Sequence, residues 1–110
     1  MIRALIIDDE AHIRKDIRNK VEDHFSNDII IIEEAESVET GLIAIDKYEP
    51  QLLFLDVHLT DGTGFDLLTQ TAYKGFDVIF ITGYDDHAIK AIKVGAVSYT
   101  HLTLPTILRV

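Results

Sequence analysis

The stretch LLFLD, residues 52–56, is one of four short apolar runs that indicate the fold. Its four apolar residues do not alternate with polar ones, so we expect a strand that is buried on both faces. Similar runs lie at residues 4–7, 29–32 and 78–81. Strands of this kind are typical of a parallel sheet covered by helices on both sides.

The segments between these runs carry helical patterns. An apolar residue recurs every four positions at Ile13, Ile17, Val21 and Phe25, which predicts an amphipathic helix. Ser37 is expected to cap a second helix that Pro50 ends. A third helix is expected from Phe65 and a fourth over residues 88–94. Alternating strands and helices predict an α/β fold with a doubly wound sheet and right-handed crossovers.

Composition limits the classes of function. The 110 residues, 47% of them hydrophobic, suit one domain. Ten basic against 19 acidic residues give a net charge of −9, which disfavours contact with nucleic acid or an anionic membrane. The absence of cysteine excludes disulfides and thiolate metal sites, and no apolar stretch is long enough to span a membrane. We therefore expect a soluble, cytoplasmic domain.

Polar residues follow the apolar runs, and at three of the four run ends they are candidate site residues. Asp8 and Asp9 follow the first run, Asp56 ends the third and Thr82 follows the fourth. If the first and third strands are neighbours, the carboxylates converge at one edge of the sheet, where such folds bind ligands. Because like charges this close are costly, the cluster suits Mg²⁺, which prefers oxygen ligands. Asp56 stands alone and is the candidate nucleophile for phosphoryl transfer, with Asp8 and Asp9 holding the metal.

Each of these residues also has a structural interpretation. Asp8, Asp9 and Glu10 could cap a helix, and Asp56 or Thr82 could be turn residues. Residues 61–64 are interpreted as a turn that caps the following helix. The five histidines, at positions 12, 24, 58, 87 and 101, share no metal-ligand spacing.

Three strings resemble the receiver domain of two-component response regulators: LIIDDE (5–10), LLFLDVHLTDGTGFDLL (52–68) and VIFITGYDDHAIKAIKVGA (78–96). The run after Thr82 is most similar to receivers of the LytR/AlgR type, which usually precede a LytTR DNA-binding domain. The resemblance implies a flavodoxin-like sheet of strand order 2-1-3-4-5 over residues 1–96. It also implies a signalling domain rather than a turnover enzyme, with a sensor histidine kinase as its partner and a homodimer formed on phosphorylation.

The resemblance further implies a role for each matching residue. Asp56 is the phosphoacceptor, Asp9 binds Mg²⁺ directly, and Asp8 binds it partly through water. The main-chain carbonyl of His58 completes the protein's share of the metal ligands.

Other matching residues are expected to contact the phosphoryl group. Thr82 supplies the switch hydroxyl, and the backbone amides of Val57 and Gly83 lie near the phosphoryl oxygens.

Residues 97–110 depart from the family pattern. The resemblance implies a lysine at position 102, where this chain has Leu102. The string VSYTHLTLPT (97–106) is also the translation of a transposon-end sequencing adapter. We therefore expect residues 97–110 to be a non-native tail, the receiver to stop before or within its fifth βα unit, and the run at 78–81 to form an edge of the sheet.

Two other functions remain open. A haloacid-dehalogenase-type phosphatase also uses a strand-end aspartate, but it needs a second acid two residues later, where this chain has His58. A pseudo-receiver that acts only as a dimerisation module usually lacks the phosphoacceptor or the acidic pair, and this chain has both.

Overall fold

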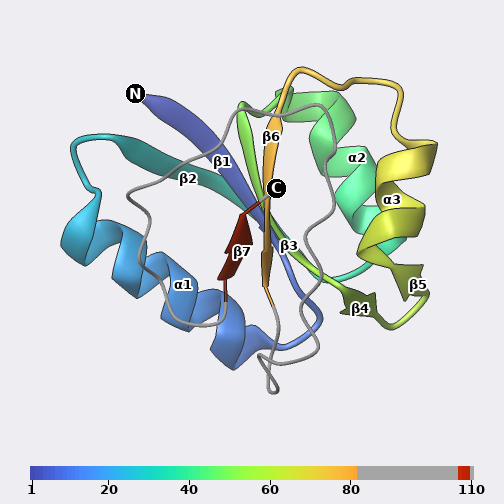
Figure 1. The fold of residues 1–110 in the computed structure, drawn as a ribbon, viewed down its shortest axis with the longest axis horizontal. Coiled ribbons are helices and arrows are strands. Elements are labelled where there is room, and N and C mark those ends of the chain that lie inside the picture. Colours follow the sequence, from blue (N-terminus) through green and yellow to red (C-terminus); the bar gives the residue numbers. More distant parts are fainter. Residues whose placement is uncertain (82–106, 110) are drawn as a thin grey trace.

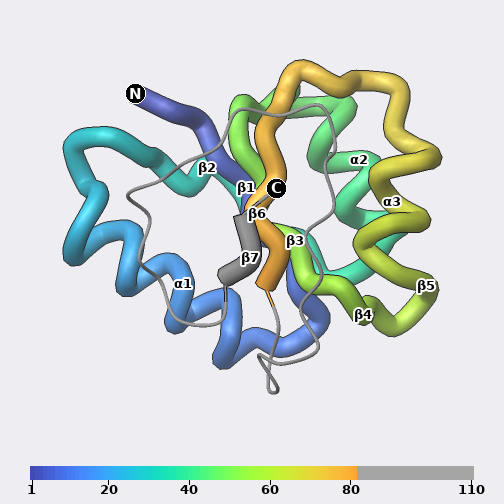
Figure 2. The backbone as a smooth tube through the Cα atoms, viewed as in Figure 1, coloured from blue at the N-terminus to red at the C-terminus, as the bar shows by residue number. Residues whose placement is uncertain are grey.

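The structure, a computed structural model, describes residues 1–81 and the strand at residues 107–109 (Figures 1 and 2). In chain order its elements are β1 (Ile2–Ile7), α1 (Ala11–His24), β2 (Ile29–Ala35), α2 (Val38–Tyr48), β3 (Leu52–Asp56), β4 (His58–Leu59), β5 (Gly62–Thr63), α3 (Gly64–Gln70), β6 (Asp77–Ile81) and β7 (Ile107–Arg109). The helix expected over residues 88–94 lies outside the described residues. No helix in the described part is long and apolar enough to cross a membrane.

The main sheet has five strands in the order β2-β1-β3-β6-β7. Its first four strands are parallel, which confirms the predicted doubly wound α/β sheet and its order. The added strand β7 pairs antiparallel with β6, joining residues 107–109 to residues 79–81. The expectation that the run at 78–81 forms an edge is therefore wrong, because β7 covers its free side.

The apolar runs are unbroken because both faces of the sheet are covered. Alternate residues of β1 and β3, such as Leu5 and Leu53, face a core that includes residues of α2 and α3. The residues between them, such as Ile6 and Phe54, face a second core that includes Ile17 of α1. Figure 1 shows α1 on one side of the sheet and α2 with α3 on the other. Two successive residues of each strand thus contribute to two different cores.

The helices begin where the sequence predicts. Ser37 caps α2 by accepting from the N–H of Thr40, and the two residues form a capping box. Thr63 forms the equivalent box with Asp66 at the start of α3. This confirms both the Ser37 cap and the capping turn expected at residues 61–64.

Strand β2 is less buried than its apolar run predicts. Of its seven residues only Ile29 and Ala35 are buried, and the side chain of Ile30 is 46% exposed. The pairing of β2 with β1 also shifts register between Ala4 and Leu5. Burial on both faces was a wrong expectation here, because β2 lies at the edge of the sheet where neighbouring elements cover it incompletely.

Gly64, the first residue of α3, lies against the end of β3. A Cβ atom at this position would stand 2.5 Å from the carbonyl oxygen of Asp56 and 3.0 Å from Cγ of Leu55. The N–H of Gly64 also donates to the carbonyl of Val57 at 2.8 Å. The close approach of two backbones therefore requires glycine at this position.

We expect Gly64→Ala to lower the free energy of unfolding by about 1–3 kcal/mol, since the added methyl meets main-chain atoms that cannot rotate away. Urea unfolding followed by circular dichroism measures this. Gly75→Ala is the matched control, because its Cβ would also meet an atom at 2.5 Å, but that atom is the hydroxyl of the Tyr73 side chain. Equal losses in the two variants would contradict the assigned contact.

Candidate functional site

The strands β1 and β3 end side by side. Their parallel register pairs Ile7 with Leu55, so Asp8 and Asp56 occupy the next position on each strand path. Asp8 is 2% exposed and Asp56 is half-buried. This confirms that the first and third strands are neighbours, and it places Asp8 and Asp56 at the same edge of the sheet.

A cluster of carboxylates lies beside the end of β1. Asp8, Asp9 and Glu10 each offer an oxygen, and these oxygens lie within 4.8 Å of one another. Oxygen-only donors on a partly open surface fit Mg²⁺, which keeps several of its waters in proteins. Glu10 was not predicted as a member, although its place after two aspartates could have suggested it.

The capping interpretation of this acidic triplet holds only in part. Glu10 is the N-cap residue of α1, but its side chain makes no capping hydrogen bond. Instead, the carboxylate of Asp8 accepts from the N–H of Glu10 at 2.8 Å. Asp9 is partly exposed and Glu10 is exposed, which leaves both accessible to a cation.

The carboxyl groups of Asp8 and Asp56 both have raised pKa values. Burial raises the pKa of Asp8 to about 6, with a further contribution from the charge of Asp9. Burial also raises the pKa of Asp56 to about 7, and the charge of Asp8 adds to it. A hydrogen bond from the N–H of His58 to Oδ1 of Asp56, at 3.3 Å, partly opposes this shift. The site therefore disfavours its own negative charges and would favour a bound cation.

The loop after Asp56 is shaped by a short hairpin of β4 and β5. His58 pairs with Thr63, and Leu59 pairs with Gly62. Sequence reasoning missed this hairpin, because two-residue strands carry too little pattern. The roles expected for the carbonyl of His58 and the amide of Val57 stay predictions, and Thr82 and Gly83 lie outside the described residues.

Asp61, at the turn of this hairpin, connects the loop to a second element. Its carboxylate accepts from the N–H of Val38 at 2.7 Å and of Glu39 at 3.1 Å, in the first turn of α2. These hydrogen bonds lower the pKa of Asp61. The sequence suggested only a turn at Asp61, because its partners lie more than twenty residues away.

Comparison with known proteins agrees with this geometry. The response regulator receiver domain family matches residues 4–101. The sensory transduction protein LytT of Enterococcus faecalis is 37% identical over 89% of this chain and 40% of its own length. LytT of Bacillus subtilis is 36% identical over 96% of this chain and 43% of its own length.

Solved structures agree as well. The MaeR response regulator bound to beryllium trifluoride is 30% identical, with a TM-score of 0.66 over 77% of this chain and 70% of its own. The chain spans about two-fifths of the length of the two LytT relatives. From the family match, the relatives and the shared fold, the chain belongs to the response regulator receiver domain family.

Proposed function

We propose that this domain accepts a phosphoryl group on Asp56 from a sensor histidine kinase and so switches an output domain. One observation carries the proposal: Asp56 ends a buried strand directly beside Asp8, whose neighbours Asp9 and Glu10 add further carboxylates. Membership of the receiver family implies a histidine kinase as the general partner. Since the chain spans about two-fifths of the length of the two LytT relatives, we propose that a further domain follows it in the whole protein. The resemblance to LytR/AlgR-type receivers implies that this output domain binds DNA and that phosphorylation forms a homodimer.

The proposed reaction is a transfer between two covalent partners. A carboxylate oxygen of Asp56 attacks phosphorus, and the bond from phosphorus to the histidine nitrogen of the kinase breaks, leaving an acyl phosphate on Asp56. Asp8, Asp9, Asp56 and the carbonyl of His58 would hold Mg²⁺, which when bound neutralises the negative charge on the carboxylates and phosphoryl oxygens.

The chain's own residues supply position and orientation. The amides of Val57 and Gly83 and the hydroxyl of Thr82 are proposed to orient the phosphoryl oxygens. Because the pKa of Asp56 is raised to about 7, its carboxyl must lose a proton before it attacks. The chain carries out no turnover in this proposal, which makes it a signalling domain. A phosphorylation-independent dimerisation module is the alternative.

Acetyl phosphate with Mg²⁺ should add one phosphoryl group to the chain when a natural receiver ending follows Ala96. Asp56→Ala should abolish the addition, because it removes the attacking oxygen. Intact-mass spectrometry measures the gain, with Asp46→Ala, an exposed aspartate of α2, as the control. Labelling that persists in Asp56→Ala would move the nucleophile elsewhere, and no labelling of the parent chain would favour the dimerisation module.

Mg²⁺ should raise the melting temperature, because it binds the folded cluster, and the effect should depend on pH. Without metal, the pKa values of Asp8 and Asp56 are raised from 3.8 to about 6 and about 7, so the folded chain holds protons on these carboxyl groups that the unfolded chain has lost. The stabilisation from these protons is full below pH 3.8 and is lost as the pH rises through about 6 and 7. Since metal ligands must be deprotonated, the Mg²⁺ effect should be small at acid pH and largest above the pKa of Asp56.

Differential scanning fluorimetry over this pH range checks both trends. Asp9→Asn should lose most of the Mg²⁺ effect, whereas Asp16→Asn, at an exposed position of α1, should keep it. An unchanged response in Asp9→Asn would contradict the assigned ligand.

We also infer that residues 97–110 are not the native ending of the receiver. The match to an adapter translation supports this, as does the antiparallel direction of β7 in an otherwise parallel sheet. A natural ending in place of the tail should raise the urea midpoint, because each core side chain that it covers contributes about 1.5–3 kcal/mol. A 110-residue chain that is monomeric and equally stable would show that the tail is native.

A further inference from the structure

The guanidinium of Arg14 joins the acidic end of β1 to β2. Arg14 lies in the first turns of α1, and its Nη1 donates to the main-chain carbonyl of Asp8 at 2.6 Å. Its Nε donates to Oε1 of Glu34 at 3.1 Å. One planar group thus binds the residue that begins the acidic cluster and a carboxylate of the neighbouring strand.

Asp8 makes hydrogen bonds through its N–H, its side chain and its main-chain carbonyl. Its N–H donates to the carbonyl of Ala35 at 3.0 Å, which extends the pairing of β1 and β2 by one residue. Its side chain accepts from the N–H of Glu10 at 2.8 Å. With Arg14 on the carbonyl, the peptide plane that leads from Asp8 to Asp9 is restrained, and this plane sets the direction in which the Asp9 carboxylate leaves the chain.

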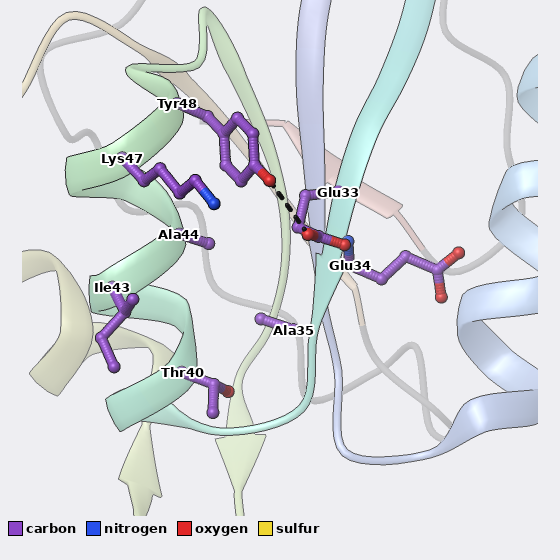
Figure 3. Close-up of a pocket in the computed structure, with 8 residues that line it drawn as sticks. All are labelled: Glu33, Glu34, Ala35, Thr40, Ile43, Ala44, Lys47 and Tyr48. Atoms are coloured by element: carbon purple, nitrogen blue, oxygen red, sulfur yellow. Dashed lines mark hydrogen bonds between the residues drawn. The ribbon is translucent and has the colours of Figure 1, made fainter.

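Glu34 keeps Arg14 in place. Figure 3 shows Glu33 and Glu34 leaving β2 on opposite sides, with Glu33 toward Tyr48 of α2 and Glu34 toward α1. Glu34 accepts from Nε of Arg14 through one oxygen and from Nε of Arg18, at 2.7 Å, through the other. The side chains of Arg14 and Glu34 are 17% and 28% exposed, so this pair is largely shielded from solvent and well able to fix a side chain.

We propose that Arg14, oriented by Glu34, is a positioning residue of the acidic cluster and that it strengthens the binding of Mg²⁺. The inference rests on the proposed function, since it assumes that the cluster takes this metal. Partners one step outside a metal site commonly set its affinity by orienting the ligands. Only a guanidinium can make both hydrogen bonds in this fixed geometry, since a lysine ammonium is a point donor on a flexible chain.

Charge and position predict opposite effects at Arg14. The positive charge of Arg14 repels a nearby cation, so on electrostatic grounds alone Arg14→Gln should bind Mg²⁺ more tightly. If Arg14 acts by positioning, the same substitution should bind Mg²⁺ more weakly. The sign of the change therefore separates the two roles, and a general loss of stability is measured independently by urea unfolding.

The test is calorimetric titration of Mg²⁺ into the 110-residue chain above the pKa of Asp56. Arg14→Gln should weaken binding by about tenfold, the lower end of the range for residues that orient metal ligands. Arg14→Lys keeps the positive charge but loses the planar guanidinium that donates to both Asp8 and Glu34. This variant should therefore also bind Mg²⁺ more weakly. Arg18→Gln is the matched control, because Arg18 lies on the same helix and binds the other oxygen of Glu34, whereas the hydrogen bond to the carbonyl of Asp8 comes from Arg14. If that hydrogen bond positions the cluster, Arg18→Gln should keep the wild-type affinity.

A double-mutant cycle tests whether Glu34 acts through Arg14. Glu34→Gln has a single acceptor oxygen for two arginines, so it should weaken Mg²⁺ binding in the wild-type chain and add little in the Arg14→Gln chain. If Arg14→Gln fails to fold, the comparison of Arg14→Lys and Glu34→Gln with Arg18→Gln decides the question.

Three outcomes would overturn the proposal. Unchanged or tighter binding in the Arg14 variants would exclude positioning by Arg14. An equal loss in Arg18→Gln would assign the effect to the helix surface. A wild-type chain that binds no Mg²⁺ would overturn the proposed function together with this inference, whereas the first two outcomes leave the proposed function intact.

Discussion

The close approach of carboxylates at the ends of β1 and β3 is the constraint on which the rest of the site depends. Parallel pairing of Ile7 with Leu55 leaves Asp8 and Asp56 at neighbouring positions, and burial makes their negative charges costly. A hydrophobic sheet buried on both faces is needed to hold the two strand ends in this register. The site therefore stores an electrostatic cost that a bound cation or a proton can relieve.

The residues around Asp8 and Asp56 restrain the main chain on either side of these two carboxyl groups. Gly64 allows the start of α3 to approach the carbonyl of Asp56, and Asp61 fastens the hairpin after Asp56 to the first turn of α2. Arg14 of α1 restrains the main chain of Asp8 through a hydrogen bond to its carbonyl. The first turns of α1 and α3 thus contact the residues that end β1 and β3, and the first turn of α2 contacts the hairpin that follows β3.

Much of the scaffold could be predicted because its signals are local. The runs at residues 4–7, 52–55 and 78–81 form buried strands, and the four-residue spacing from Ile13 places Ile17 and Val21 in the core. The convergence of Asp8 with Asp56 followed from strand order. The wider role of Asp61 could not be predicted, since its partners are distant in sequence and its dipeptide with Gly62 is an ordinary turn signal. The exposure of β2 and the direction of β7 depend on which strand lies at the edge of the sheet, which no single segment encodes.

Asp8 and Asp56 form a desolvated, mutually repelling pair, and a bound cation would relieve this repulsion. The direct measurement is the carboxyl-carbon chemical shift of both residues, followed by NMR as a function of pH with and without Mg²⁺. Without metal, the pKa values should be raised, to about 6 for Asp8 and about 7 for Asp56, and saturating Mg²⁺ should lower both. Titration of both groups near 3.8 in the metal-free chain, with no response to Mg²⁺, would show that the two carboxyl groups neither repel each other nor bind the cation.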